Sequence, residues 1–287
     1  MQLVSGTAPA PGSDNAHAAF TLLWTRLPLT LLVMHSANPE ALAAPLHFNF
    51  ATDVIDRWAQ ERPESPALWC VNATTDAEQK YTFKQLATLS CQAADFLRSS
   101  GIRRGDRVLV MLPRVPEWWI GMLSLIRLGA VPVPGTLLLT ARDVAYRLGS
   151  ARISAVITNL DGVAKVGGFE GTRLLVGGER PGWLDFDRGV RGASTEFRGE
   201  RTRSDDPGII YFTSATTGYP KMVVHTQASY GLGHRLTGQL WLDLGPRMCI
   251  GTCPTWGGVR PHGRASTAPG RWARACSRWI RRASLTP

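Results

Sequence analysis

A strand, a helix and a second strand follow one another within residues 107–134, and this order constrains the fold more than any other feature of the sequence. Residues 107–112, Arg-Val-Leu-Val-Met-Leu, form an almost continuous apolar run, which is typical of a strand buried on both faces of a parallel sheet. Pro116 begins a helical segment that ends at Gly129, and residues 130–134 predict a short extended piece. Two strands joined by a helix in this way predict a βαβ crossover in a three-layer α/β domain.

Two further helices are predicted before this unit. Residues 50–59 carry apolar side chains at helical spacing, with Thr52 or Asp53 as the cap. Thr82 predicts the cap of a longer helix that ends at Gly101. The apolar stripe of this longer helix consists of Leu86, Leu89, Ala93, Phe96 and Leu97.

The alternation of strands and helices continues after the crossover. Residues 140–148 predict a helix, and residues 154–158 and 173–176 predict strands. Residues 208–213 predict a further buried strand, and we expect it and the strand at 154–158 to run parallel to the first buried strand. The segment 161–206 is rich in Gly, Arg and Asp and has only short apolar runs, so most of it is predicted to be loop.

A polar segment follows the last predicted strand directly. Its members are Thr213, Ser214, Ala215, Thr216, Thr217, Gly218, Tyr219, Pro220 and Lys221. The hydroxyl groups supply hydrogen-bond donors, Gly218 lets backbone N–H groups approach an anion closely, and Lys221 adds a positive charge. These groups suit a polyphosphate, although a polar turn with a solvated Lys221 explains the spacing equally well. The segment is not a Walker A loop, because the pattern G-x-x-x-x-G-K-[ST] is absent.

Residues 211–222, Tyr-Phe-Thr-Ser-Ala-Thr-Thr-Gly-Tyr-Pro-Lys-Met, resemble the phosphate-binding signature of the adenylate-forming superfamily. This superfamily includes acyl-CoA synthetases, luciferases and peptide-synthetase adenylation domains. Other segments resemble the medium-chain acyl-CoA synthetases in particular: Phe48-Asn-Phe-Ala, Pro66-Ala-Leu-Trp, Gly105-Asp-Arg-Val, Leu112-Pro-Arg-Val-Pro-Glu-Trp-Trp and Gly233-His-Arg-Leu-Thr-Gly. The resemblance covers about Phe48 to Pro246.

The resemblance implies a fold, an activity and a set of partners. The fold is a mostly parallel sheet flanked by helices, of which this chain holds the N-terminal part of the large domain. The activity is that of an AMP-forming acid–thiol ligase of lipid metabolism, which converts a medium-chain fatty or related carboxylic acid to an acyl-adenylate and then to an acyl-CoA. ATP, Mg²⁺ and coenzyme A are the implied cofactors, and the family pattern assigns the ATP phosphates to Thr213–Lys221. We expect a cytoplasmic location, with the mitochondrial matrix as the alternative.

Two departures from the family pattern affect the expected activity. Ala215 stands where the family usually has glycine, and a left-handed backbone there costs an alanine about 1 kcal/mol. The family's ribose-binding aspartate, its acidic motif and the small domain with the catalytic lysine have no counterpart in these 287 residues. We therefore assign no catalytic residue and no metal ligand, and expect the chain alone to be inactive. The alternative is a non-catalytic, nucleotide-binding pseudoenzyme. For His225, packing and a place in a pocket wall are equally compatible.

The positive charge of the chain is concentrated at one end. The net charge is +10, and eight arginines after Pro246, with no acidic residue or lysine, carry +8 of it. The preceding 246 residues carry only +2, so a nucleic-acid partner is not expected. The cysteines of the tail and its single histidine, His262, match no standard zinc pattern. No membrane span is expected, because no apolar run reaches roughly 18 residues.

Three segments are predicted: residues 1–46 as a disordered extension, 47–246 as a partial AMP-dependent synthetase domain, and 247–287 as a non-homologous basic tail. Codons compatible with the tail, translated one base earlier, give strings such as D-V-H-W-N-L-S-D-M-G-W, which resemble the continuation of the family. We therefore expect a change of reading frame between Pro246 and Met248, and a tail that packs poorly. Its many Arg, Gly and Pro residues are also typical of a disordered segment.

Overall fold

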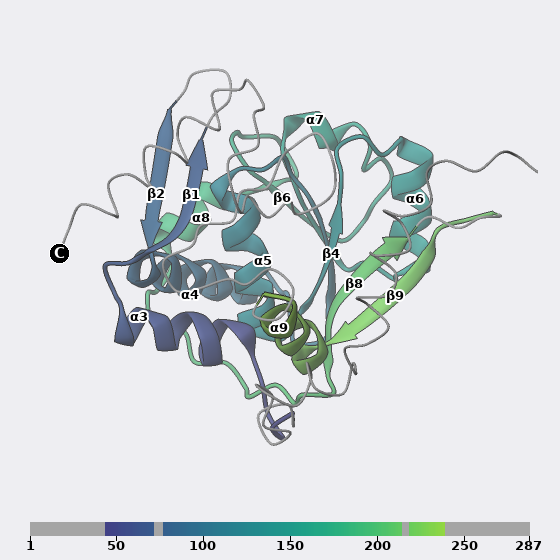
Figure 1. Ribbon diagram of the computed structural model, residues 1–287. Coiled ribbons are helices and arrows are strands. Elements are labelled where there is room, and N and C mark those ends of the chain that lie inside the picture. Colours follow the sequence, from purple (N-terminus) through teal and green to yellow (C-terminus); the bar gives the residue numbers. More distant parts are fainter. Residues whose placement is uncertain (1–43, 72–76, 214–217, 239–287) are drawn as a thin grey trace, which may run out of the picture. The chain divides into compact units, whose positions relative to one another are not determined.

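The computed structural model describes residues 44–71, 77–213 and 218–238 of the chain (Figure 1). The expectations for the extension 1–46, apart from its last three residues, and for the tail 247–287 lie outside the described residues, and so does the predicted frame change. In the described ranges, no helix has both the length and the apolar character needed to cross a membrane.

A five-stranded parallel sheet forms the centre of the described residues. Its strand order is β4-β3-β5-β6-β7, with β3 at Arg107–Met111, β4 at Val131–Gly135, β5 at Ala155–Thr158, β6 at Thr172–Leu175 and β7 at Leu184–Asp185. Helix α5, Pro116–Leu128, joins β3 to β4, and Gly129 ends the helix in the left-handed conformation with φ 76°. The predicted βαβ crossover is therefore confirmed, and the predicted strands at 107–112 and 154–158 do run parallel.

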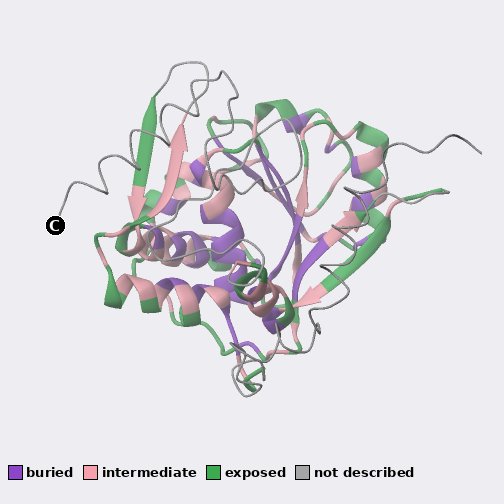
Figure 2. Cartoon of the chain, viewed as in Figure 1, coloured by how far each residue is buried: buried purple, intermediate pink, exposed green. Residues whose placement is uncertain are grey.

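The sheet is buried on both faces (Figure 2). Besides α5, the helices that cover it are α4 at Phe83–Ser99, α6 at Ala141–Ser150 and α8 at Phe186–Gly192. Val108 and Val110 of β3 belong to a core cluster with residues of α4, α5 and α8. Leu109 and Met111 belong to a second cluster, which includes Val144 of α6. Successive side chains of a strand point to opposite faces, so the continuous apolar run of β3 has a core to fill on each side.

The helix predicted at residues 50–59 is present, but its cap lies earlier in the chain than predicted. It consists of the π-helical segment η2 (Ala51–Asp56) followed by α3 (Arg57–Glu61). Asn49 caps it, because its Oδ1 accepts a hydrogen bond from the first backbone N–H of η2 at 3.0 Å. The predicted cap at Thr52 or Asp53 is wrong. Asp53 instead accepts a hydrogen bond at 2.7 Å from the backbone N–H of Asn49, so it supports the cap from inside the helix.

The predicted ends of α4 are confirmed. Thr82 forms a capping box with Gln85: the Thr82 hydroxyl accepts from the Gln85 backbone, and the Gln85 side chain accepts from the Thr82 backbone. Gly101 follows the helix with φ 93°, a value that favours glycine. A second capping box, between Thr140 and Asp143, begins α6, so the helix predicted at 140–148 is also present.

The segment 161–206 contains more regular structure than predicted. Strand β6 confirms the strand predicted at 173–176. The additional elements are β7 and α8, and the short helix α7 (Leu160–Val163), which begins just before the segment. Helix α8 has seven residues and buries only Phe186 and Val190 on its apolar side, a pattern too short to be told from a loop. The sequence pattern also does not predict the antiparallel hairpin of β1 (Pro66–Val71) and β2 (Glu78–Thr82).

Strand β8 corrects one prediction. The residues predicted as a buried strand at 208–213 do form β8 (Pro207–Thr213), but the expected parallel pairing is wrong. Its partner is β9 (Lys221–Thr226), which pairs with it antiparallel in a separate two-stranded sheet. Strand β8 packs beside β4, which is an edge strand of the five-stranded sheet.

The prolines of β4 explain why β8 does not extend the central sheet. The backbone N–H of Val131 donates to the carbonyl oxygen of Asp106 at 2.8 Å, so Val131 turns its backbone groups toward β3. Because backbone groups alternate in direction along a strand, Pro132 and Pro134 present the opposite edge, toward β8. Proline has no backbone N–H to donate, which confines it to sheet edges.

Strand β9 exposes an apolar edge, and we expect it to drive self-association of the purified chain. Met222, Val223 and Val224 are 41%, 37% and 50% exposed, and in the described residues no strand other than β8 pairs with β9. Open apolar edges are templates for aggregation. Val224→Lys should therefore reduce light scattering and hydrophobic-dye binding, whereas Leu160→Lys, at an equally exposed leucine on α7, should change them little. A wild-type chain that stays monomeric and binds no dye would contradict this expectation.

Candidate functional site

The β8–β9 hairpin brings the two ends of the predicted phosphate-binding segment together. Thr213 and Lys221 are its last paired residues, and the Thr213 hydroxyl lies 3.5 Å from the Lys221 carbonyl oxygen, to which it donates. Gly218 has φ 91°, so the chain uses glycine's freedom at this point of the loop. Ser214, Ala215, Thr216 and Thr217 lie outside the described residues, and the predicted backbone penalty at Ala215 stays a prediction.

Lys221 is exposed at the end of the hairpin, and among the described residues it makes no ion pair. An exposed ammonium group without a carboxylate partner keeps its charge and its three N–H donors available to an anion. The structure therefore places Thr213, Gly218 and Lys221 on one short loop, as the sequence predicts.

Helix α6 contacts the far half of this loop. The Tyr146 and Tyr219 rings stack with centroids 4.7 Å apart and planes 17° apart. The Tyr146 hydroxyl donates to the carbonyl oxygen of Pro220 at 3.2 Å, and Arg142 donates to the Tyr219 hydroxyl at 3.3 Å. Phe212, on β8 before the loop, lies edge-on to Tyr146, with the two ring centroids 6.1 Å apart. Sequence reasoning missed these contacts, because Tyr146 carries no motif that links it to a loop more than 70 residues away.

An aromatic cluster lies near the end of the hairpin at which α9 (Gln227–Leu236) follows β9. The hydroxyl oxygens of Tyr211 and Tyr230 are 2.7 Å apart, and burial together with this hydrogen bond raises the pKa of Tyr211. His225 lies 6.2 Å from the Tyr211 ring and 5.8 Å from the Tyr230 ring. Burial, and to a lesser extent the neighbouring His225, lowers the pKa of His234. Of the two alternatives for His225, these ring contacts favour packing.

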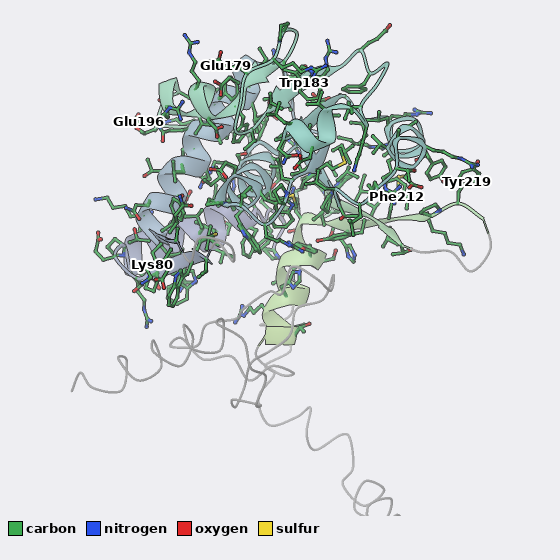
Figure 3. All side chains as sticks on the ribbon, turned by 90° about the horizontal axis from the view of Figure 1, so that it is seen from above. Lys80, Glu179, Trp183, Glu196, Phe212 and Tyr219 are labelled. Atoms are coloured by element: carbon green, nitrogen blue, oxygen red, sulfur yellow. The ribbon has the colours of Figure 1, made fainter. Side chains whose placement is uncertain are left out.

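Two open cavities among the described residues are lined by residues outside the loop. One, of about 950 Å³, is lined by residues of α4, α8 and the segment before β7, including Glu179 and Trp183 (Figure 3). The other, of about 550 Å³, lies beside the start of α4. No group of three or more His, Cys, Asp or Glu side chains in the described part of the chain could hold a metal ion.

Residues 55–250 match the model of a protein family described as AMP-binding enzyme. This chain belongs to the AMP-binding enzyme family. The family predicted from the sequence motifs is therefore confirmed.

Curated proteins similar to this AMP-binding chain are acyl-coenzyme A synthetases by name. The mitochondrial acyl-coenzyme A synthetase ACSM4 of Homo sapiens is 43% identical over 235 residues, which cover 77% of this chain and 40% of that protein. The mitochondrial ACSM5 of Homo sapiens is 44% identical over 213 residues, which cover 70% of this chain and 37% of that protein. The chain thus spans about two-fifths of the length of these relatives.

Solved structures with the same fold are also acyl-CoA synthetases. The acetoacetyl-CoA synthetase from Streptomyces lividans superposes with a TM-score of 0.63 and 28% identity, over 69% of this chain and 33% of that one. The acyl-CoA synthetase of Brucella canis gives a TM-score of 0.59 and 26% identity, over 71% and 37%. These neighbours confirm the predicted fold class, a partial large domain of the adenylate-forming fold.

Proposed function

We propose that this chain is part of an AMP-forming acyl-CoA synthetase and that Thr213–Lys221 hold the phosphates of its ATP. The observation that carries the proposal is the exposed Lys221, which makes no ion pair with any described residue, at the end of a hairpin whose loop contains the positive-φ Gly218. Family membership and the names of the relatives support the reaction class. The domain that we assign to this function spans residues 47–246.

The hydrogen-bond donors of the loop suit the stabilisation of a departing phosphate group rather than a nucleophilic attack by the protein. In the proposed reaction, a carboxylate oxygen of the acid forms a bond to the α-phosphorus of ATP while the bond to pyrophosphate breaks. We assign the Lys221 ammonium group, the loop hydroxyls and the backbone N–H groups around Gly218 to the phosphates that leave. Donors arranged in advance around developing negative charge stabilise the transition state. In the second half-reaction, the thiol of coenzyme A displaces AMP from the acyl-adenylate.

We treat Mg²⁺ as part of the MgATP substrate. The described residues offer hydroxyl, ammonium and backbone N–H groups at the loop, but no acidic cluster that suits a resident cation. We therefore assign no metal ligand among the described residues.

The loop itself indicates neither the carboxylic acid substrate nor the location of the protein in the cell. A medium-chain fatty or related carboxylic acid is the proposed substrate, as the sequence motifs imply. We propose a mitochondrial location, the alternative considered from the sequence, because the relatives described above are named as mitochondrial.

Titration of MgATP into the 287-residue chain tests the proposal. We expect saturable binding that inorganic pyrophosphate displaces, because the loop offers its donors to phosphate oxygens. Adenosine should compete much more weakly. The absence of MgATP binding, or binding that adenosine displaces as well as pyrophosphate does, would overturn the assignment of phosphates to this loop.

A further inference from the structure

We propose that α6 is a positioning element for the loop, with Tyr146 and Arg142 as positioning residues that hold Tyr219 and Pro220 in place. The effect of this clamp on phosphate binding rests on the function proposed above. The clamp itself is defined by contacts between α6 and the loop.

Three kinds of contact act on the same two loop residues. The Tyr146 ring stacks on Tyr219 at 4.7 Å, and its hydroxyl donates to the Pro220 carbonyl oxygen at 3.2 Å. Arg142, one turn earlier on α6, donates to the hydroxyl at the tip of Tyr219 at 3.3 Å. The Tyr219 ring is therefore held at its face and at its hydroxyl, and the backbone is held at the next residue.

The exposure of Tyr219 argues that these contacts serve the loop rather than the core. Tyr219 is 59% exposed, so its ring adds little to the buried apolar surface. The ring is stacked on a helix although it is largely exposed. This contact fixes the direction of the loop backbone. Phe212 lies on β8 and Tyr219 in the loop that follows it (Figure 3), and the Tyr146 ring contacts both of their rings.

The helix that carries the clamp is itself firmly held. A capping box between Thr140 and Asp143 fixes its first turn. Val144 is fully buried in the core cluster on that face of the sheet. The guanidinium group of Arg147 lies 5.0 Å from the centre of the Phe212 ring and donates to the carbonyl oxygen of Asp143. The clamp therefore joins the loop to a rigid part of the fold.

Because α6 already holds one half of the loop, a ligand that binds there has to fix fewer backbone conformations. The ladder pair Thr213–Lys221 already closes the base of the loop, and α6 fixes the residues just before Lys221. Restricting a loop in its binding conformation raises affinity by lowering the entropy lost on binding. Loss of an aromatic stack and a hydrogen bond together corresponds to about a tenfold change in an equilibrium constant.

Limited trypsin digestion of the full chain tests the clamp without a ligand. Tyr146→Leu should speed cleavage after Lys221 about tenfold, while cleavage after Lys84, inside α4, reports global unfolding and should not change. Tyr146→Phe keeps the stack and should restore most of the protection. Tyr219→Leu, at an exposed site that cannot disturb the core, should also speed cleavage after Lys221. The double variant should be accelerated by less than the product of the two single effects, because both single variants already remove the stack between Tyr146 and Tyr219.

Two results would overturn the clamp. One is unchanged cleavage after Lys221 in Tyr219→Leu. The other is an acceleration in the double variant that equals the product of the two single effects, since a stack shared by the two residues can be lost only once. If Tyr146→Leu also speeds cleavage after Lys84, that variant has lost its fold. The Tyr219→Leu variant then tests the clamp by itself. Tyr81→Leu makes the same side-chain change on β2 and should leave the loop unaffected.

Titration with inorganic pyrophosphate tests the positioning role separately. Tyr146→Leu and Tyr219→Leu should weaken pyrophosphate binding about three- to tenfold, and Tyr146→Phe should recover most of it. A loosened loop with unchanged pyrophosphate affinity would overturn the positioning role. If the wild-type chain binds no pyrophosphate, the proposed function and the positioning role both fail, whereas the digestion still decides whether α6 holds the loop.

Discussion

Replacing Asp56 by alanine should lower the free energy of unfolding by about 3–5 kcal/mol, a large part of the stability of a typical domain. Arg127 of α5 is the reason. Its side chain is only 3% exposed, and its two terminal nitrogens lie 2.7 Å and 2.6 Å from the two carboxylate oxygens of Asp56. Its Nε donates to the Ser90 hydroxyl of α4 at 3.0 Å. Without Asp56, a buried guanidinium group keeps its charge and loses its counter-ion.

The reverse substitution should be milder. The Asp56 side chain is 30% exposed, so in Arg127→Met water can still solvate the remaining carboxylate. Replacing both partners, in Asp56→Leu/Arg127→Met, should cost less than Asp56→Ala alone, because no unpaired charge is left in the core. Urea unfolding followed by circular dichroism measures all three variants. Equal losses for Asp56→Ala and Arg127→Met would show that the burial of Arg127 does not determine the cost.

Lys221→Ala should weaken the binding of MgATP and of pyrophosphate about 10- to 100-fold, because a hydrogen bond to a charged group contributes about 1.5–3 kcal/mol. The fold should be unaffected, since Lys221 is exposed and makes no ion pair among the described residues. Lys221→Arg keeps the charge and should retain most of the affinity.

Lys84→Ala is the matched control for this effect. It removes one exposed positive charge from α4, away from the loop, and so reports the general effect of net charge on anion binding. Calorimetric titration of the three variants and the wild type gives the comparison. Equal weakening by Lys84→Ala and Lys221→Ala would mean that Lys221 acts only through net charge, and the loop would then be a polar turn.

Local chemistry accounts for the parts of the fold that could be predicted. The apolar run of β3, the threonine caps of α4 and α6, and the glycines that end α4 and α5 each act within a few residues, so their outcome is visible in the sequence. The cap at Asn49 was missed because Asn, Thr and Asp all accept hydrogen bonds at a helix start. Only the backbone shows which of them precedes the first turn.

Long-range pairing explains most of the features that could not be predicted from the sequence. The apolar character of β8 reveals its burial but not its partner. The prolines of β4 keep β8 out of the central sheet, and the short loop after β8 brings β9 back antiparallel to it. The loop residues at the ends of the candidate site were predicted from their chemistry. The contribution of Tyr146 and Arg142 was not, because their partners lie 74 and 77 residues further along the chain.

Hydrogen exchange of the full chain with and without inorganic pyrophosphate tests the central claim most directly, because it locates the anion on the sequence. We expect slower exchange in peptides that cover residues 213–221, and no change around the 950 Å³ cavity beside α8. This protection should be lost in Lys221→Ala. Protection confined to residues 179–193, which line that cavity, or no protection at any position, would contradict the claim that the loop between β8 and β9 holds the phosphates.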